Sequence, residues 1–321
     1  MHKRLVNQCR IHLTLIPDGP ILIKSGKEGA DPTKPNMEFV ETYHAGGRSI
    51  YLPGSSLKGA IRAHAERIVR TVGRDFKPNN LNTVWANDPL KDNYDYLNND
   101  GKPLPSSELY KQSSFTDQMF GNTSIASRVR IEDAYPVDKS QLKLEERNGV
   151  AIDRVFGSVA VGPFNYQVCT GGEFETKIHL KNFSLAQLGL IGLVLRDLNE
   201  GWFGLGFAKS RGLGMVEVKL NSAVVQYPGC ILEGDRIHSI GSQNQWSHNS
   251  LLGAGVFLEE KERQNYGFPA NDIQATPIRA ESMSLGFGVQ LSWQGNDEAG
   301  VPDLFVKSVR AWRQKLEETA A

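Results

Sequence analysis

The sequence has few cysteines, no excess charge of either sign and no long apolar run. Its three cysteines, Cys9, Cys169 and Cys230, lie far apart and have no histidine at the spacing of metal ligands. Neither a zinc site nor a disulfide framework is therefore indicated, and a reducing cytoplasm is the expected environment. The most apolar stretch, residues 185–195, is well short of the roughly 18 residues that a membrane span needs. No signal pattern opens the chain, so we expect a soluble cytoplasmic protein without a membrane partner.

The formal net charge is zero, because 36 lysines and arginines balance 36 aspartates and glutamates. Bulk composition therefore gives no support to the binding of nucleic acid or of a membrane surface. The distribution is uneven, since basic side chains outnumber acidic ones in residues 1–74. With 321 residues, 40% of them hydrophobic, the chain can bury a substantial core. We expect one domain with large insertions, or one domain with an appendage.

A turn and a helix start come together in residues 51–62. Pro53 and Gly54 end an extended run, and Ser55 or Ser56 can cap a helix that we predict over residues 55–73. The 3.6-residue period places one set of side chains on an apolar face and another on a polar face. The apolar set is Leu57, Ile61, Ala65, Ile68 and Val72, and the polar set is Lys58, Arg62, Glu66 and Arg70.

This helix start has two interpretations. Unpaired backbone amides, two serine hydroxyls and Lys58 one turn later are suited to a phosphate group. Alternatively, the serines only cap the helix, and Arg62, Glu66 and Arg70 form i,i+4 ion pairs on a solvated face. A nucleotide-binding P-loop is excluded, because its glycine spacing is absent and Lys58 is followed by Gly59.

The order of the predicted elements indicates an α+β fold. Alternation and helical periodicity give, in order, strand 11–16, helix 55–73, strand 127–135, strand 174–180, helix 185–199 with Ser184 as its cap, and strand 215–220. This βαββαβ order is that of the ferredoxin-like (RRM-like) motif, which single-strand RNA-binding domains share.

Other segments interrupt or extend this predicted core, which spans residues 1–220. We expect an irregular loop over 24–48, an insertion over 75–118 and a β-hairpin within 137–168. Residues 221–321 form a C-terminal extension that ends in a helix over 306–318, and we assign this extension no chemistry.

Residues 201–214 form a glycine-rich loop that leads from the second predicted helix into the last strand. The loop lacks the third glycine of the dinucleotide fingerprint and does not lead from a strand into a helix, so a Rossmann site is excluded. Lys209 and Arg211 could contact a phosphodiester backbone from such a loop. A plain connection with two solvated cations explains the five glycines less well.

Five motifs in a fixed order resemble the RAMP superfamily and, more narrowly, the backbone subunits of type III CRISPR RNA-guided effector complexes. They are residues 52–62 (LPGSSLKGAIR), 120–121 (FG), 127–134 (SRVRIEDA), 152–154 (IDR) and 209–214 (KSRGLG). The resemblance spans residues 8–220. It implies a filament of subunits in which each grips CRISPR RNA, with other backbone and large subunits and a target RNA as further partners. The residues expected to contact RNA are Ser55, Ser56, Lys58, Arg62, Lys209, Ser210 and Arg211.

The resemblance also implies a thumb and a catalytic acid. A thumb hairpin displaces nucleotides of the guide–target duplex, which residues 137–168 would do with Phe156 or Phe164 as the wedge; alternatively, these rings are ordinary hairpin core. An aspartate between the first strand and the first helix supports metal-dependent cleavage of target RNA. Asp31 matches that position best and Asp18 is second, although an aspartate before proline is usually a turn former. The implied cofactor is a divalent cation, Mg²⁺, whose ligands the sequence does not specify.

These observations leave three alternative functions to be tested. The first is an endoribonuclease subunit that cuts guide-paired target RNA. The second is a non-catalytic scaffold that binds CRISPR RNA. The third is a repeat-processing endoribonuclease that uses His44 in place of a metal.

Overall fold

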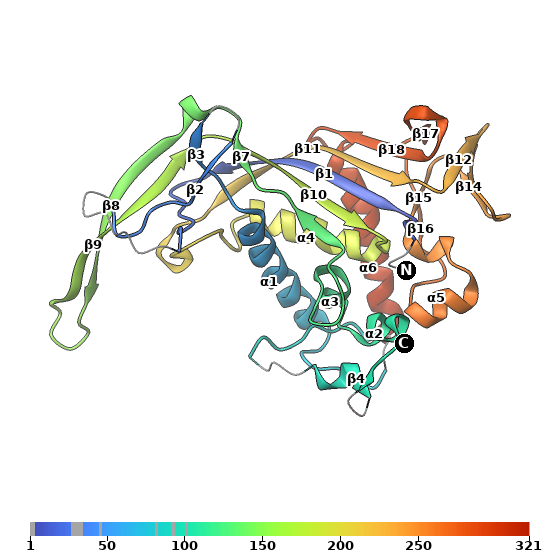
Figure 1. The fold of residues 1–321 in the computed structure, drawn as a ribbon, viewed down its shortest axis with the longest axis horizontal. Helices are drawn as coiled ribbons and strands as arrows, with labels where there is room; N and C mark the ends of the chain where they lie inside the picture. Colours follow the sequence, from blue (N-terminus) through green and yellow to red (C-terminus); the bar gives the residue numbers. More distant parts are fainter. Residues whose placement is uncertain are drawn as a thin grey trace.

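A computed structural model describes residues 4–26, 35–44, 47–80, 83–90, 94–99 and 102–320. Its main feature is an antiparallel sheet with helices packed on one face (Figure 1). This arrangement confirms the predicted α+β class. The strands lie in the order β17 (Glu281–Ser282), β18 (Val289–Gln294), β11 (Val216–Tyr227), β1 (Gln8–Pro17), β10 (Phe174–Lys181) and β6 (Val129–Ile131), and β7 (Tyr135–Pro136) pairs with the start of β10.

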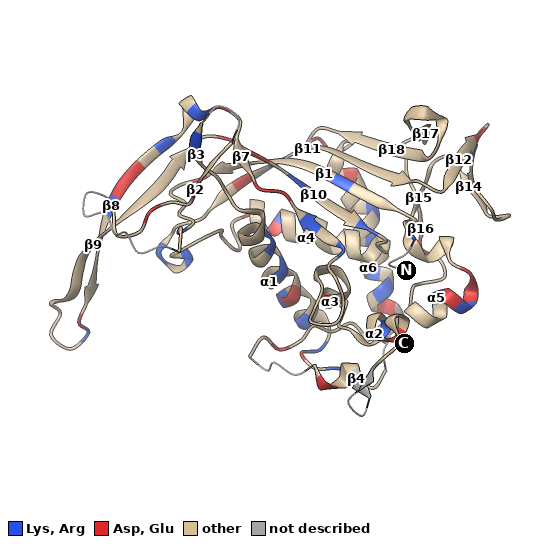
Figure 2. Ribbon diagram, in the orientation of Figure 1, with Lys and Arg blue, Asp and Glu red and all other residues tan. Residues whose placement is uncertain are grey.

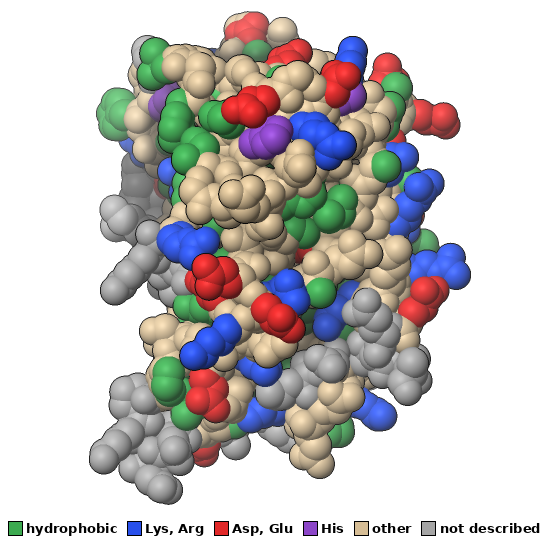
Figure 3. All heavy atoms as spheres, turned by 90° about the vertical axis from the view of Figure 1, so that its right-hand side faces the viewer, with side chains coloured by type: hydrophobic (Ala, Val, Ile, Leu, Met, Phe, Trp, Pro, Cys, Tyr) green, Lys and Arg blue, Asp and Glu red, His purple; other side chains and the backbone are tan. Residues whose placement is uncertain are grey.

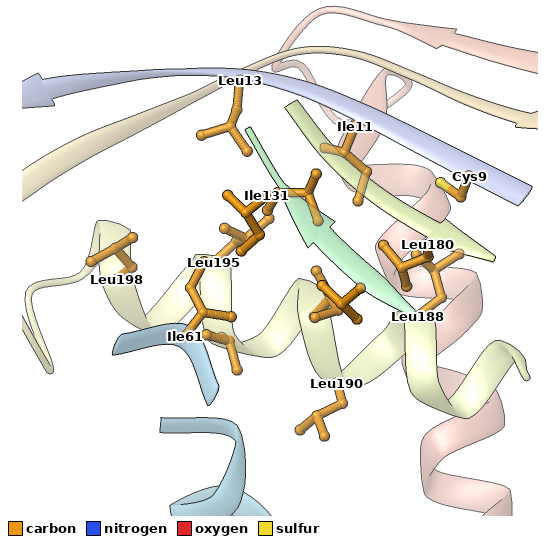
Figure 4. Close-up of a cluster of buried hydrophobic side chains, with 14 of the residues drawn as sticks. Cys9, Ile11, Leu13, Ile61, Ile131, Leu180, Leu188, Leu190, Leu195 and Leu198 are labelled. Carbon is orange, nitrogen blue, oxygen red and sulfur yellow. The ribbon is translucent and has the colours of Figure 1, made fainter. Parts of the chain in front are cut away.

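The core lies between the sheet and the helices α1 (Gly54–Val72), α4 (Leu185–Asn199) and α6 (Val301–Ala320). Every second residue of β1 faces this layer, so Ile11, Leu13 and Leu15 are buried as the alternation predicted. Figure 4 shows Ile11 and Leu13 directed toward leucines of α4 and toward Ile61 of α1. Cys9 lies in the same layer, where burial raises the pKa of its thiol to about 12.

The predicted helix caps have different outcomes. Ser184 caps α4 as expected, in a capping box with Gln187. Neither Ser55 nor Ser56 caps α1, which begins at Gly54 without a side-chain cap from its own turn. Asp133, beyond β6, takes that role, because its Oδ1 accepts a 2.7 Å hydrogen bond from the Gly54 amide. A carboxylate at a helix N-terminus also interacts favourably with the helix dipole.

The apolar stripe of α1 differs from the prediction at its end. Leu57, Ile61 and Ala65 are buried as expected, but the next buried residue is Val69. Ile68 is half-buried and Val72, the last helical residue, is 49% exposed. The stripe drifts around the helix because Leu57, Ile61, Ala65 and Val69 follow each other at steps of four residues, slightly more than one helical turn of 3.6 residues.

Several loops contain more regular structure than the sequence predicted. Within 24–48, β2 (Glu41–Tyr43) pairs with β3 (Arg48–Ile50). The 75–118 segment contains η1 (Asp95–Leu97), β4 (Asn98–Asn99), β5 (Lys102–Pro103), α2 (Ser106–Gln112) and α3 (Phe115–Phe120). The predicted hairpin is present as β8 (Lys143–Ile152) paired with β9 (Val159–Gly171), after the short helix η2 (Lys139–Gln141). This hairpin projects far from the sheet (Figure 1).

The C-terminal residues are joined to the same sheet and the same core. β18 pairs with β11, and α6, which begins at Val301 and not at 306, packs along α4. Close approach of α4 and α6 requires Gly189 and Gly192, since a Cβ at either position would overlap Ser308 or Phe305. The remaining elements are β12 (Cys230–Glu233), β13 (Arg236–Ser239), β14 (Gln245–Ser247), β15 (Ser250–Leu252), η4 (Ala254–Phe257), α5 (Glu260–Tyr266), β16 (Ile273–Ala275) and η5 (Ser284–Gly286). Among the helices of the described ranges, none has the length and apolarity that crossing a bilayer requires.

Candidate nucleic-acid interface

A groove of about 800 Å³ lies where β6, β10, β1 and the start of α1 meet. In the described part of the chain, its lining contains basic side chains and no aspartate or glutamate. The solvent-accessible cations are Arg10, Lys58, Arg130 and Lys181, with His179 among them. A concave surface lined by charge of one sign attracts ligands of the opposite sign. We therefore define these five residues as the basic groove.

Strand register brings three of these residues into one row. Arg10 on β1 lies opposite His179 on β10, and His179 lies opposite Arg130 on β6. Directly paired residues point to the same face of a sheet, here the face opposite the core. Figure 2 marks the basic positions of β1 and α1 in blue. The row thus spans three strands, with an arginine on β1 and on β6 and a histidine between them on β10.

Glu132 lies at the rim of the basic groove and interacts with part of this row. Its Oε1 is 2.6 Å from His179 Nε2 and 3.3 Å from Arg130 Nη2. Arg10 and Lys181 form no ion pair with any residue that the structure describes. These two exposed cations are therefore the ones most available to an incoming phosphate.

The start of α1 forms one wall of the groove. Gly54 is needed there because an added Cβ would overlap the carbonyl oxygen of Ile131. Ser55 is exposed and Ser56 half-buried, and Lys58 Nζ donates a 2.8 Å hydrogen bond to Ser127 Oγ. Partial burial, and then the charge of Arg62, lower the pKa of Lys58. The predicted Ser55 and Lys58 therefore lie together in the groove.

Arg62 has a different environment from Lys58. Its guanidinium donates to Asp117 Oδ1 at 2.7 Å, to Glu66 Oε1 at 2.8 Å and to the carbonyl of Gly121 at 2.9 Å. The predicted i,i+4 pairs of Glu66 with Arg62 and with Arg70 are both present. Burial raises the pKa of Asp117 to about 6, although Arg62 opposes that rise. Arg62 thus joins α3 to α1.

The glycine-rich loop lies apart from the lining of the basic groove. Lys209, Ser210 and Arg211 form the exposed turn η3 (Lys209–Arg211). The loop packs on the segment after β1, where the Phe207 amide donates to the Leu22 carbonyl at 2.7 Å. Gly206 has φ +76°, and an added Cβ would overlap that same carbonyl. This close approach to Leu22 explains why position 206 of the loop is a glycine.

The two candidate wedge residues of the β8–β9 hairpin lie in different environments. Phe156 is at the tip and is 84% exposed, so it is not part of a hairpin core. Asp153 holds that tip in a tight turn by accepting hydrogen bonds from the amides of Val155 and Phe156. Phe164 is half-buried and lies over Gly149, where an added Cβ would be 2.6 Å from the ring.

Neither Asp18 nor His44 is among the described residues that line the groove. Asp31 lies outside the described residues. Asp18 is exposed in the turn after β1, and His44 stacks on Tyr135. In the ranges that the structure describes, no group of three or more His, Cys, Asp and Glu side chains could hold a metal.

Sequence reasoning missed Arg10, Arg130, His179 and Lys181. Each lies on a strand at a position that alternates with buried residues, so the outward face of these strands carried the signal. Their convergence depends on strand pairing between residues more than 40 positions apart, which local patterns do not contain.

A protein-family comparison decides the relationship. The model of the RAMP superfamily matches residues 14–217, which run from β1 through α1, β6, β10 and α4 into β11. The chain belongs to the RAMP superfamily. This RAMP protein has no match among curated proteins. Its family supports a CRISPR-associated, RNA-binding role, and most of the basic groove lies within the matched residues.

Proposed function

We propose that this RAMP protein is a backbone subunit of a type III CRISPR effector complex and that it holds CRISPR RNA in the basic groove. The observation that supports this proposal is a groove lined by four accessible cations and one histidine, without a carboxylate among its described lining residues. This groove lies in a chain of the RAMP superfamily. Cations of this kind bind the sugar-phosphate backbone regardless of base sequence. Other backbone and large subunits and a target RNA are the proposed partners.

The sheet order supports the finer fold assignment within this proposal. The elements β1, α1, β6, β10, α4 and β11 follow each other along the chain as βαββαβ, with the strands side by side as β11-β1-β10-β6. We assign this unit to the ferredoxin-like motif, which many RNA-binding domains use. The β8–β9 hairpin is the proposed thumb, with exposed Phe156 as its wedge in preference to the packed Phe164.

The salt dependence of RNA affinity tests the groove. Arg10→Ala and Lys181→Ala should each weaken binding of single-stranded RNA and reduce the slope of log K against log salt by about 0.7, because each removes one phosphate contact. Lys261→Ala, at an exposed lysine of α5, is the matched control and should leave the slope unchanged. Identical slopes in all three variants would place the RNA elsewhere.

We also propose that Asp31 supports Mg²⁺-dependent cleavage of the guide-paired target. Asp31→Asn in the assembled complex should retain CRISPR RNA and lose target cleavage at regular positions. Asp18→Asn tests the second candidate acid and should leave cleavage unchanged if Asp31 is the catalytic residue. Cleavage unchanged in both variants would leave the scaffold function, and cleavage that persists in a chelator would favour a metal-independent mechanism.

A further inference from the structure

Three aromatic rings stack in series beside the base of the β8–β9 hairpin. The His44 imidazole lies on the Tyr135 ring with centroids 3.7 Å apart and an interplanar angle of 11°. Tyr135 in turn lies 5.9 Å from Tyr51 at 16°. The three residues come from the position after β2, from β7 and from the position after β3. We call His44, Tyr135 and Tyr51 the aromatic ladder.

Hydrogen bonds hold the ladder in place before any ligand arrives. Lys139 Nζ donates to the carbonyls of His44 at 2.8 Å and of Gly47 at 3.0 Å. The Tyr135 hydroxyl donates to Asp133 Oδ2 at 3.3 Å. Leu52 and Ala134, the neighbours of Tyr51 and Tyr135, exchange two backbone hydrogen bonds at 2.9 and 2.8 Å. Such preorganisation lowers the entropy cost of binding.

Space for a ligand lies beside the ladder. A pocket of about 330 Å³ is lined by His44 and Tyr135, by the hydroxyl residues Thr42 and Ser49, and by residues 136–139. His44 is exposed, and Tyr135 covers one face of its imidazole. A flat aromatic ligand can stack on the remaining face. Unpaired RNA bases bind proteins in this way, on histidine, tyrosine and phenylalanine rings.

Asp133 connects the ladder to the basic groove. One carboxylate oxygen of Asp133 accepts from the amide of Gly54, which lines the groove, and the other accepts from Tyr135 of the ladder. The two surfaces are therefore separated by a single side chain at the start of α1. A strand that leaves the groove past Gly54 would come to Tyr135, on which His44 stacks.

We propose that the aromatic ladder is a second RNA subsite, which stacks one unpaired nucleobase of the bound strand on the His44 imidazole. This inference rests on the proposed RNA-binding function of the groove. The groove holds phosphates and the ladder holds a base. Because every base has a π face, the subsite fixes the register of the strand without reading its sequence.

Fluorescence of 2-aminopurine tests the subsite. The full chain is titrated with short single-stranded RNAs that carry 2-aminopurine at one position each. Because the subsite does not read the base sequence, at least one position should be quenched on binding. His44→Ala should abolish that quenching and raise Kd about tenfold, within the range that one base–aromatic stack contributes. His44→Phe restores a ring and should keep both properties. Tyr43→Ala removes a neighbouring ring that is 79% exposed and outside the ladder, and it should match the wild type.

The outcomes separate this inference from the function on which it rests. Melting temperatures show whether each variant is folded; if His44→Ala is not, His44→Leu, which has no π face, should show the same loss of quenching. Salt-dependent RNA binding with no quenched position, or quenching unchanged in a folded His44→Ala protein, overturns the subsite and leaves the groove standing. Failure of the wild-type chain to bind any of the RNAs overturns both.

Discussion

The basic groove and the face formed by the C-terminal residues arrange their charges in opposite ways. On the C-terminal face, Arg279 pairs with Asp235 at 3.1 Å and Arg4 pairs with Glu262 of α5 at 2.9 Å. Figure 3 shows basic and acidic side chains intermingled over this side of the molecule. In the groove, Arg10 and Lys181 have no ion-pair partner among the described residues. A net charge of zero thus conceals a local excess of positive charge, and the spatial distribution of charge carries the functional information.

The largest expected effect comes from reversing charge in each region. Arg10→Glu with Lys181→Glu should raise the Kd for single-stranded RNA on the order of 1,000-fold at low salt, because two phosphate contacts become repulsive. Lys261→Glu with Arg279→Glu makes the same change in net charge on the C-terminal face. That pair should change Kd by less than about threefold, since screened charges far from the ligand contribute little. Filter binding at two salt concentrations measures both, and equal losses would remove the distinction between the two regions.

Two glycines of α1 differ in the space around them: Gly54 is tightly packed at the groove wall, and Gly59, farther along the helix, is not. Gly54→Ala should lower the free energy of unfolding by about 3 kcal/mol and weaken RNA binding, because its Cβ would push α1 away from Ile131. Gly59→Ala has open space and should instead stabilise the helix by about 0.5–1 kcal/mol. Urea denaturation of both variants measures the difference. A Gly54→Ala protein as stable as the wild type would show that the contact at the groove wall is loose.

Two buried carboxylates outside the groove lining have different partners. Asp117, on α3, is paired with Arg62, and its pKa is raised to about 6 by burial. Asp272, in the C-terminal residues, is fully buried, accepts from the Leu185 amide and has a pKa raised to about 7. Both values exceed the value of about 4 in an unfolded chain, so the folded state binds these protons more tightly.

The free energy of unfolding should therefore fall as pH rises from about 4 to 7. Asp117→Asn should remove about 2 kcal/mol of this fall between pH 4 and 6, and Asp272→Asn should remove the part that extends to pH 7. Urea midpoints at several pH values measure each contribution. A wild-type protein whose stability rises over this range would contradict the assignment.

The smallest effect on stability is expected for substitutions in the β8–β9 hairpin. Phe156→Ser should change stability by less than about 0.5 kcal/mol, because the ring is almost fully exposed at the tip. Phe164→Ala should cost about 1 kcal/mol, because it removes the contact with Gly149. If Phe156 is a wedge, Phe156→Ser alters target cleavage in the assembled complex and leaves the melting temperature unchanged.

The elements that local patterns specify were predictable. Alternation located β1 and β10, and Ser184 as the cap together with helical periodicity located α4 to the residue. The contacts that define the candidate site are not local. The cap of α1 comes from Asp133, 79 positions away, and the partner Asp117 of Arg62 lies 55 positions away. A sequence window contains neither, because both depend on how the sheet and α3 pack against α1.

The same reason explains which lining residues of the groove could be predicted. Lys58 and Ser55 were predicted as RNA contacts because they follow a helix start in sequence, and that role stays a prediction. Arg10 and Lys181 were missed because the register of β1 and β10 brings them together, Arg10 opposite His179 and Lys181 opposite Gln8. The family match then gave these exposed cations a ligand class that their chemistry alone leaves open.

The most direct test of the RNA groove is ultraviolet crosslinking of single-stranded RNA to the full chain, followed by mass spectrometry of the crosslinked peptides. Crosslinks are expected in peptides that contain residues 5–10, 127–131 and 179–181, and they should be lost in the Arg10→Glu, Lys181→Glu protein. Crosslinks confined to peptides of β12, β13, β14 and α5, with none around the basic groove, would contradict it.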